Sequence, residues 1–197
     1  MIIKCSDDLK FFLKKDAASM GVIRNTVLER VKLFFTNPRW RFIYLLRRAE
    51  YYKNVRPLPF GKILRMFYFM LYKNSGIRLG FSIPLNVCGP GLSLPHYGTI
   101  VISKQARIGC NCRIHVCVNI GASGGRPEAP VVGDNVYIGP GAKLFGNIRV
   151  ADNVYIGANA VVNKSIAEDG AIVGGVPAKV LKKSVKTWWQ QNEINLL

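Results

Sequence analysis

The chain has 197 residues, of which 49% are hydrophobic and 20% charged, so its composition is that of a globular protein and excludes wholesale disorder. The net charge of +17 favours anionic partners, such as nucleic acid, acidic lipids or phosphorylated small molecules, without choosing among them. The first fifteen residues lack the apolar core of a secretion signal, and the five clustered cysteines suit a reducing compartment, so we expect a cytoplasmic protein.

Residues 1–75 predict an α-helical N-terminal region. Breaks at Asn37-Pro38 and at Pro57 and Pro59 separate four helical segments, at 9–15, 27–35, 39–53 and 61–72. This region carries a net charge of +11, against +6 for residues 76–197, and its aromatic and basic residues are interleaved. We expect a helical cap that packs on the rest of the chain and on neighbouring subunits. The alternative is a surface that contacts anionic lipids at the inner membrane face.

Residues 76–183 are dominated by a six-residue repeat. Six consecutive blocks fill 132–167, namely VGDNVY, IGPGAK, LFGNIR, VADNVY, IGANAV and VNKSIA. Five blocks in the same register fill 96–125, namely HYGTIV, ISKQAR, IGCNCR, IHVCVN and IGASGG. A Gly/Pro-rich excursion between Gly121 and Val131 is the one interruption. A period of six fits neither a helix nor a simple strand.

Such a repeat predicts a parallel β-helix, because each block supplies a short strand and a tight corner. The aliphatic first position points inward, and Gly or Asn at the corner accepts backbone angles that other residues resist. Three sides close a triangular coil of about 18 residues, and stacked coils bury a continuous aliphatic column. The repeat does not define the handedness of the coil. For residues 184–197 we expect a short C-terminal helix, anchored by Trp188 and Trp189.

His96 is the predicted catalytic residue. It occupies the first position of its block, where the pattern calls for an aliphatic side chain, and departures of this kind tend to mark function. Its surroundings, GPGLSLPHYG (89–98), are rich in glycine. The other histidine, His115, follows 19 residues later, or about one coil away. We expect His115 either to line an acceptor pocket or to be structural.

The sequence resembles the hexapeptide-repeat acyltransferases, and among them the serine acetyltransferase group, over residues 76–183. The similar segments are GLSLPHYGTIVI (91–102), IHVCVNIGASGG (114–125), VYIGPGAKLFGNIRVADNVYIGANAVV (136–162) and IVGGVPAKVL (172–181). The resemblance implies a left-handed β-helix, a homotrimer, and acetyl-CoA bound in the groove between adjacent subunits. It also implies direct acetyl transfer, with neutral His96 taking the proton of an acceptor hydroxyl.

The resemblance further assigns the cofactor-binding residues. Pantetheine is expected near Gly121, Gly141 and Ala142. The adenine and 3′-phosphate end is expected near three residues close to the C-terminus of the repeat, namely Lys164, Ala178 and Lys179.

The sequence departs from the serine acetyltransferase pattern around the acceptor. Pro95 and Ser82 stand where that group carries acidic residues, and the loop RPEAP (126–130) lacks its histidine. Arg126 and Glu128 remain to bind an acceptor, together with Ser82 and His115, and Glu128 or a backbone carbonyl could orient His96. We therefore predict a sugar acceptor, as in capsule or O-antigen O-acetyltransferases. The alternative is a serine O-acetyltransferase.

Three further interpretations are less well supported by the residues. Cys110, Cys112, His115 and Cys117 cluster, but their spacing matches no standard zinc pattern, and we expect no metal. A β-helical carbonic anhydrase needs three zinc-binding histidines, and this chain has two. A remote alternative is a non-enzymatic, basic β-helical binding protein. No RNA-binding motif or aromatic stacking platform is recognisable, and we expect no nucleic-acid partner.

Overall fold

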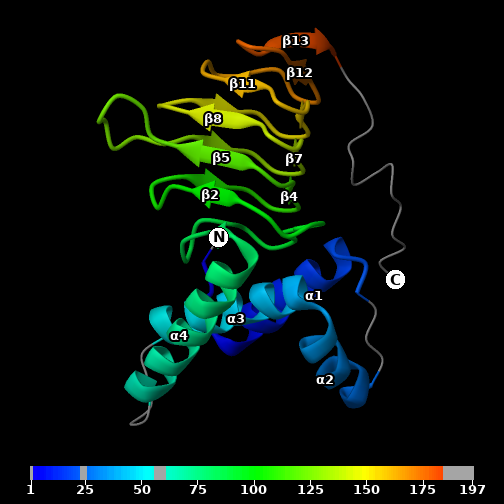
Figure 1. Cartoon of the computed structure of the whole chain (residues 1–197), viewed down its shortest axis with the longest axis vertical. Helices are drawn as coiled ribbons and strands as arrows, with labels where there is room; N and C mark the ends of the chain where they lie inside the picture. Colours follow the sequence, from blue (N-terminus) through cyan, green and yellow to red (C-terminus); the bar gives the residue numbers. More distant parts are fainter. Residues whose placement is uncertain (1, 23–25, 56–60, 184–197) are drawn as a thin grey trace.

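The computed structural model describes residues 2–22, 26–55 and 61–183. A layer of four helices forms one end of the molecule, and a stack of β-coils rises from it (Figure 1). The helices are α1 (Ser6–Ser19), α2 (Val27–Thr36), α3 (Pro38–Asn54) and α4 (Gly61–Leu79). Each contains one of the four predicted helical segments. Asn37 ends α2 and begins α3, where its side-chain oxygen accepts a hydrogen bond from the Trp40 amide at 3.1 Å.

The coil has three sheets, and their strands from β1 to β12 pair in parallel, as the repeat predicts. Sheet A orders its strands β1-β2-β5-β8-β11, sheet B β3-β6-β9, and sheet C β4-β7-β10-β12-β13. The strands are β1 (Phe81–Ser82), β2 (Ile100–Ile102), β3 (Arg107–Ile108), β4 (Arg113–Ile114), β5 (Val118–Gly121), β6 (Val131–Val132), β7 (Tyr137–Ile138), β8 (Lys143–Phe145), β9 (Arg149–Val150), β10 (Tyr155–Ile156), β11 (Val161–Val162), β12 (Ile172–Gly174) and β13 (Lys179–Lys182).

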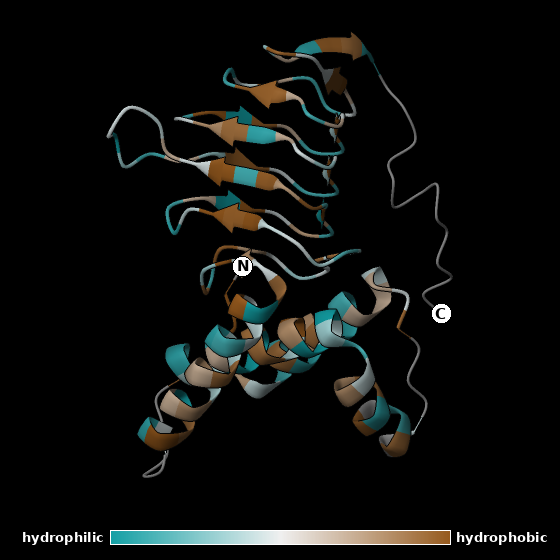
Figure 2. Ribbon diagram, in the orientation of Figure 1, coloured by the Kyte–Doolittle hydropathy of each residue, from teal (hydrophilic) through white to brown (hydrophobic). Residues whose placement is uncertain are grey.

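The inward positions of the repeat form one continuous core. Ile114, Ile138 and Ile156 stack in sheet C, and Ile120 and Leu144 stack in sheet A, all fully buried. The strands are mostly brown in the hydropathy colouring of Figure 2, whereas the corners are paler. Burial of each such side chain is worth about 1.5–3 kcal/mol, so the column supplies most of the driving force for stacking.

The corner between sheets B and C is held by a ladder of asparagines. Asn111, Asn135 and Asn153 have φ of 53°, 58° and 60°, in the left-handed region that Asn tolerates. The Nδ2 of Asn111 donates to the Oδ1 of Asn135, and the Nδ2 of Asn135 donates to the Oδ1 of Asn153, each at 3.0 Å. The ladder ends where Asn153 donates to Asp169 at 2.8 Å.

A buried ionic cluster joins the helical layer to the first coil. Arg47 lies 2.8 Å from Asp16 and 3.0 Å from Glu50, with all three side chains almost fully buried. Arg47 also donates to the Gly89 carbonyl at 2.7 Å, and Asp16 accepts from the Leu92 amide at 2.9 Å. These bonds fix the backbone of 88–92, which leads directly to His96.

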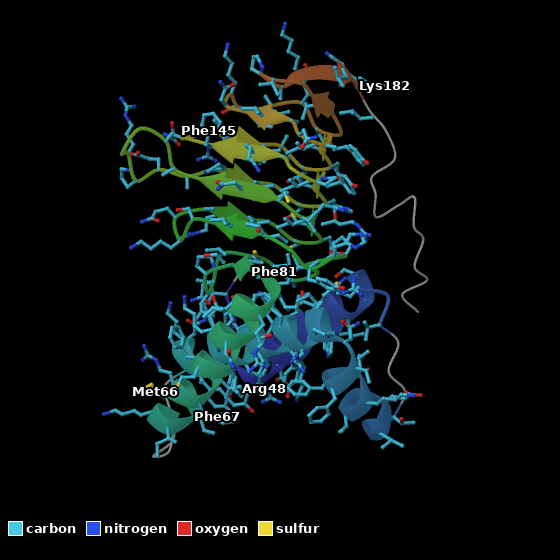
Figure 3. The ribbon with its side chains drawn as sticks, viewed as in Figure 1. Arg48, Met66, Phe67, Phe81, Phe145 and Lys182 are labelled. Carbon is cyan, nitrogen blue, oxygen red and sulfur yellow. The ribbon has the colours of Figure 1, made fainter. Side chains whose placement is uncertain are left out.

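The structure differs from the sequence prediction at both ends of the repeat. Helix α4 continues to Leu79, past the predicted boundary at 75, because Gly76 lets the helix lie against the coil. A Cβ on Gly76 would lie 2.8 Å from the carbonyl oxygen of Phe81, the residue labelled at this junction in Figure 3. At the far end, β13 runs antiparallel to β12. The predicted C-terminal helix, 184–197, lies outside the described residues.

Candidate active site

His96 lies in an enlarged corner of the first coil. In regular coils, paired residues are 18 positions apart, as for Ile138 and Ile156, whereas Ser93 pairs with Arg113, 20 positions later. The two additional residues fall between sheets C and A, in the turn that contains His96. Leu94, not His96, fills the inward position and is fully buried, while His96 is exposed. The prediction that His96 occupies the aliphatic position was therefore wrong in register.

Hydrogen bonds on both sides of His96 hold this turn. A guanidinium N–H of Arg39, at the start of α3, donates to the carbonyl of Pro95. On the other side, the Gly98 amide donates to the Leu79 carbonyl at 2.9 Å. The helical layer thus positions the backbone of the predicted base. Among the described residues, no hydrogen bond or ion pair reaches the His96 imidazole itself.

A second imidazole lies beside it, as the one-coil spacing predicts. The ring centroids of His96 and His115 are 5.9 Å apart, and that of Tyr137 is 4.9 Å from His115. The Nε of Arg113 donates to the Nε2 of His115 at 3.4 Å, and an Nη of Arg113 reaches the Ser93 hydroxyl at 3.4 Å. The result is a polar and aromatic surface over the first coils of sheet C.

Electrostatics keep His115 neutral in this cluster. Burial, together with the charge of Arg113 and the neighbouring His96, lowers the pKa of His115 to about 4. An unprotonated Nε2 is also what the hydrogen bond from Arg113 requires. Burial and a hydrogen bond with Tyr155 raise the pKa of Tyr137 to about 12, and the two phenol rings stack at 4.1 Å. A neutral imidazole and the neutral phenol of Tyr137 therefore lie beside the Arg113 guanidinium.

The predicted site residues separate onto two edges of the triangular coil. We call the corner between sheets C and A (95–99, 115–117, 139–141, 157–159 and 175–178) the histidine edge. The corner between sheets A and B (103–105, 121–130, 145–147 and 163–165) is the loop edge. The histidine edge contains His96, His115, Gly141 and Ala178, with Lys179 just beyond it. The loop edge contains the other predicted site residues that lie at a corner of the coil, namely Gly121, Arg126, Glu128 and Lys164.

The strands of sheet A separate these two edges. Arg126 and Glu128 are exposed on the loop after β5, which projects from the side of the coil (Figure 1). Strands of up to four residues span roughly 13 Å at 3.3 Å per residue. Within one chain, the loop therefore starts on the opposite side of sheet A from His96.

Two predicted site residues lie elsewhere. Ala142 is a fully buried inward position of sheet A, so its side chain contacts the core and not a cofactor, and a bulky residue there would disrupt packing. Ser82 is exposed in β1 and lines a hollow with Tyr72, Lys73 and Ile77, a lining that does not include His96. The structure therefore does not bring Ser82 to the imidazole.

The three cysteines near His115 differ in their burial. Cys112 is an inward core residue, as expected from its place in the repeat, and burial raises its pKa. Cys117 is exposed, and Cys110 is partly buried. Within 2–22, 26–55 and 61–183, no three His, Cys, Asp or Glu side chains are grouped so as to hold a metal ion.

Sequence reasoning missed the neighbours of the histidines. Arg113, Tyr137 and Tyr155 all occupy the outward sixth position of a block and lie in one column of sheet C. The signal was present, because VGDNVY and VADNVY place tyrosines one coil apart. Arg39 gave no comparable signal, since its partner is a backbone carbonyl of a segment 56 residues away.

The six-residue repeat of this chain matches a known protein family. Residues 129–164 match the family described as bacterial transferase hexapeptide (six repeats). Among curated relatives, a serine acetyltransferase of Mycobacterium tuberculosis is 40% identical over 103 residues, covering 51% of this chain and 44% of its own. A serine acetyltransferase of Staphylococcus aureus is 29% identical over 185 residues, covering 93% of this chain and 80% of its own.

Solved structures of serine acetyltransferases are also similar to this chain, over most of its length. Serine acetyltransferase isoform 3 of Entamoeba histolytica, crystallised with cysteine, superimposes with a TM-score of 0.63 at 26% identity. The match covers 90% of this chain and 61% of that one. The chain spans about half the length of the curated relatives that it matches first, such as the mycobacterial enzyme.

These comparisons, with the repeat itself, indicate a left-handed β-helix that follows a helical N-terminal region, as the resemblance implied. They also bear on the acceptor. The relatives are named for serine, so they favour the alternative prediction over the saccharide acceptor that we placed first.

Proposed function

We propose that this chain is an acetyl-CoA-dependent O-acetyltransferase in which His96 is the general base. The supporting observation is the exposed His96 imidazole in an enlarged corner, at the foot of an edge whose next two turns are built from small residues. Above His115, the histidine edge passes through Gly139, Pro140, Gly141, Gly157, Ala158 and Asn159 before it reaches 175–178. Such an edge has room for an extended thioester, and Lys179 beyond its end supplies a cation for phosphate.

Acetyl-CoA supplies a thioester carbonyl that an alcohol can attack. In this mechanism the acceptor hydroxyl gives its proton to His96 as its oxygen forms a bond to that carbonyl carbon. The carbon–sulfur bond then breaks, and the proton passes to the departing thiolate. The turn anchored by Arg39 and by the Gly98 amide holds the imidazole at the edge throughout.

The proposed acceptor is L-serine, following the names of the relatives. Serine is a zwitterion, so its site needs a cation and an anion near the base. Arg113, in contact with His115 beside His96, is placed to pair with the carboxylate. For the ammonium group, the candidate is Glu128, which is exposed on the projecting loop.

A complete acceptor site then needs more than one chain. Since Glu128 and Arg126 start from the loop edge, across sheet A from His96, a neighbouring subunit is the natural source of these side chains. We propose a homotrimer in which the histidine edge of one subunit faces the loop edge of the next. Gly121 and Lys164, also on the loop edge, would then face Gly141 and Ala178 across the same groove.

A saccharide hydroxyl is the second candidate acceptor. Its specific support is Pro95, the neighbour of His96, which stands where the resemblance to serine acetyltransferases implies an acidic residue. Among the described residues, no carboxylate contacts His96 or His115. The column of His115, Tyr137 and Tyr155 rings gives this side of the coil an aromatic surface, which suits a sugar ring better than a small zwitterion.

The test is release of free CoA, measured with a thiol reagent. The full chain is incubated with acetyl-CoA and either L-serine, a panel of nucleotide sugars, or lipid-linked oligosaccharides. We expect saturable turnover with L-serine. The variant Arg113→Gln should raise the KM for serine more than it lowers kcat, because the proposed partner of Arg113 is the substrate carboxylate.

Each alternative outcome is informative. Turnover with a glycan and none with serine would replace the acceptor and keep the enzyme class. An absence of CoA release with every acceptor, together with an absence of acetyl-CoA binding by calorimetry, would contradict the proposed function altogether.

A further inference from the structure

Helix α4 presents an uncovered apolar stripe to the outside. Ile63, Met66, Phe67, Met70 and Ile77 recur at the spacing that aligns residues on one helix face, and all are exposed. Met66 is 63% exposed and Ile77 is 79% exposed. In Figure 3, Met66 and Phe67 lie on the lower part of α4, away from the coil.

The opposite face of α4 is already used for packing. Tyr68 stacks on Tyr52 of α3 at 5.0 Å, Tyr72 is buried against Phe42, and Gly76 lies against the first coil. A helix that is apolar on both faces is normally buried on both. Only one face of α4 is covered by the described residues of this chain, so the exposed stripe needs a second partner.

The charges around the stripe identify that partner. On a helical wheel, Lys62 and Lys73 flank the stripe on one side and Arg78 flanks it on the other, and all three are exposed. From residue 51 to residue 127 the sequence contains ten Lys or Arg and no Asp or Glu. An apolar stripe whose bordering charged residues are all cations matches an anionic lipid surface, where acyl chains receive the apolar residues and headgroups receive the cations.

Helix α2 extends this surface. Leu28, Val31 and Phe35 are exposed along it at helical spacing, with Lys32 among them. Both α2 and the N-terminal part of α4 lie at the end of the molecule opposite β13 (Figure 1). No helix in the described part of the chain has the length and apolarity needed to cross a bilayer.

We propose that the exposed faces of α4 and α2 dock the protein on a membrane surface rich in anionic lipid. A second copy of the chain is the less suitable occupant, because a symmetric contact would bring the cations bordering one stripe against the same cations of the other. Docking in this orientation places the helical layer against the lipid. The first coil, which contains His96, then lies closer to the membrane than any other coil.

The test is sedimentation of the full chain with vesicles at about 0.1 M salt. One preparation contains phosphatidylcholine alone, and the other contains about one third phosphatidylglycerol. We expect binding to the anionic vesicles only, and weaker binding at higher salt. Lys62→Glu combined with Lys73→Glu should weaken it roughly 30-fold or more, since each cation near such a surface contributes about fivefold.

Matched variants distinguish binding through the α4 stripe from non-specific adsorption to vesicles. Met66→Glu with Met70→Glu should abolish binding while circular dichroism and the melting temperature stay unchanged, since both side chains are exposed. The control is Leu181→Glu, which alters an equally exposed apolar residue (69%) on β13, at the opposite end, and should bind as the wild type does.

Three results would overturn the proposal. The first is no binding of the full chain to anionic vesicles. The second is binding that survives the α4 substitutions. The third is a loss of oligomer mass in the Met66→Glu, Met70→Glu variant by sedimentation velocity without lipid, which would show that a second copy covers the stripe.

Discussion

At the scale of single residues, the register of the first coil decides where the His96 imidazole lies. The sequence selected His96 as the candidate base because it interrupts the repeat, and it assigned the imidazole to the inward position. An insertion of two residues between Leu94 and Ile100 restores Leu94 to the core and moves the imidazole to the surface. A block repeat read from its regular part cannot detect such an insertion, because the register is defined only by which residues pair across coils.

His115 provides a test of the electrostatics beside His96. Its pKa of about 4 lies below the ordinary value near 6.5, so between these pH values the folded chain binds fewer protons than the unfolded chain. The free energy of unfolding should therefore fall as the pH drops from about 6.5 towards 4. In His115→Gln this part of the pH dependence should be lost.

Nuclear magnetic resonance measures the same property directly. The ring protons of His115 should stay at their neutral positions until the pH nears 4. Titration near 6.5 would show that Arg113 and burial do not act on this imidazole as the structure implies.

At the scale of elements, the asparagine ladder accounts for how the coils keep their register. Asn135 combines a positive φ with two side-chain bonds, one to the coil below and one to the coil above. Asn135→Ala should lose both bonds and strain the backbone, lowering the free energy of unfolding by about 1–3 kcal/mol in urea titrations.

Asn135→Gly separates the two contributions, because glycine accepts a positive φ without strain. It should cost clearly less than Asn135→Ala. Equal losses in the two variants would mean that backbone strain at this corner is negligible and that only the ladder bonds matter.

The ionic cluster between α1, α3 and the first coil is the second element to test. Arg47→Met leaves the carboxylates of Asp16 and Glu50 buried without their cation, which should cost about 3–5 kcal/mol of unfolding free energy. Burial opposes the charge on Arg47, yet Asp16 and Glu50 outweigh it and raise the Arg47 pKa.

An ion pair of the same kind on the surface of α1 serves as control. Lys10 and Asp7 are 2.9 Å apart but highly exposed, so Lys10→Met should leave the urea midpoint unchanged. If Arg47→Met also left the urea midpoint unchanged, the ionic cluster would not be what holds the 88–92 segment to the helices.

At the scale of the whole molecule, the six-residue repeat predicted the β-coil. It did not predict how the coil meets the segments at its two ends. The period predicted the three sheets and the inward column because the regular blocks all obey the same rule. The antiparallel β13 and the docking of Gly76 on Phe81 depend on contacts between segments of different pattern, which no periodicity encodes. The same holds for the candidate site. The position of His115 beside His96 was predictable from the spacing of the coils, whereas the contact of Arg39 with Pro95 was not.

The proposed trimer makes a prediction about mixtures. A His96→Ala chain keeps its loop edge, and an Arg126→Ala, Glu128→Ala chain keeps its histidine edge. If each site joins the two edges of neighbouring subunits, co-expression of the two inactive chains should restore a measurable part of the wild-type turnover. A mixture no more active than the two separate variants would mean that each site is built within one chain.

The most direct test of the central claim is turnover of His96→Ala with acetyl-CoA and the acceptor that the wild type uses. Loss of the general base should lower kcat by about 10²–10⁴-fold. Calorimetry should show nearly unchanged acetyl-CoA affinity, because the exposed imidazole is assigned to the acceptor hydroxyl. Turnover by His96→Ala at the wild-type rate would contradict the account.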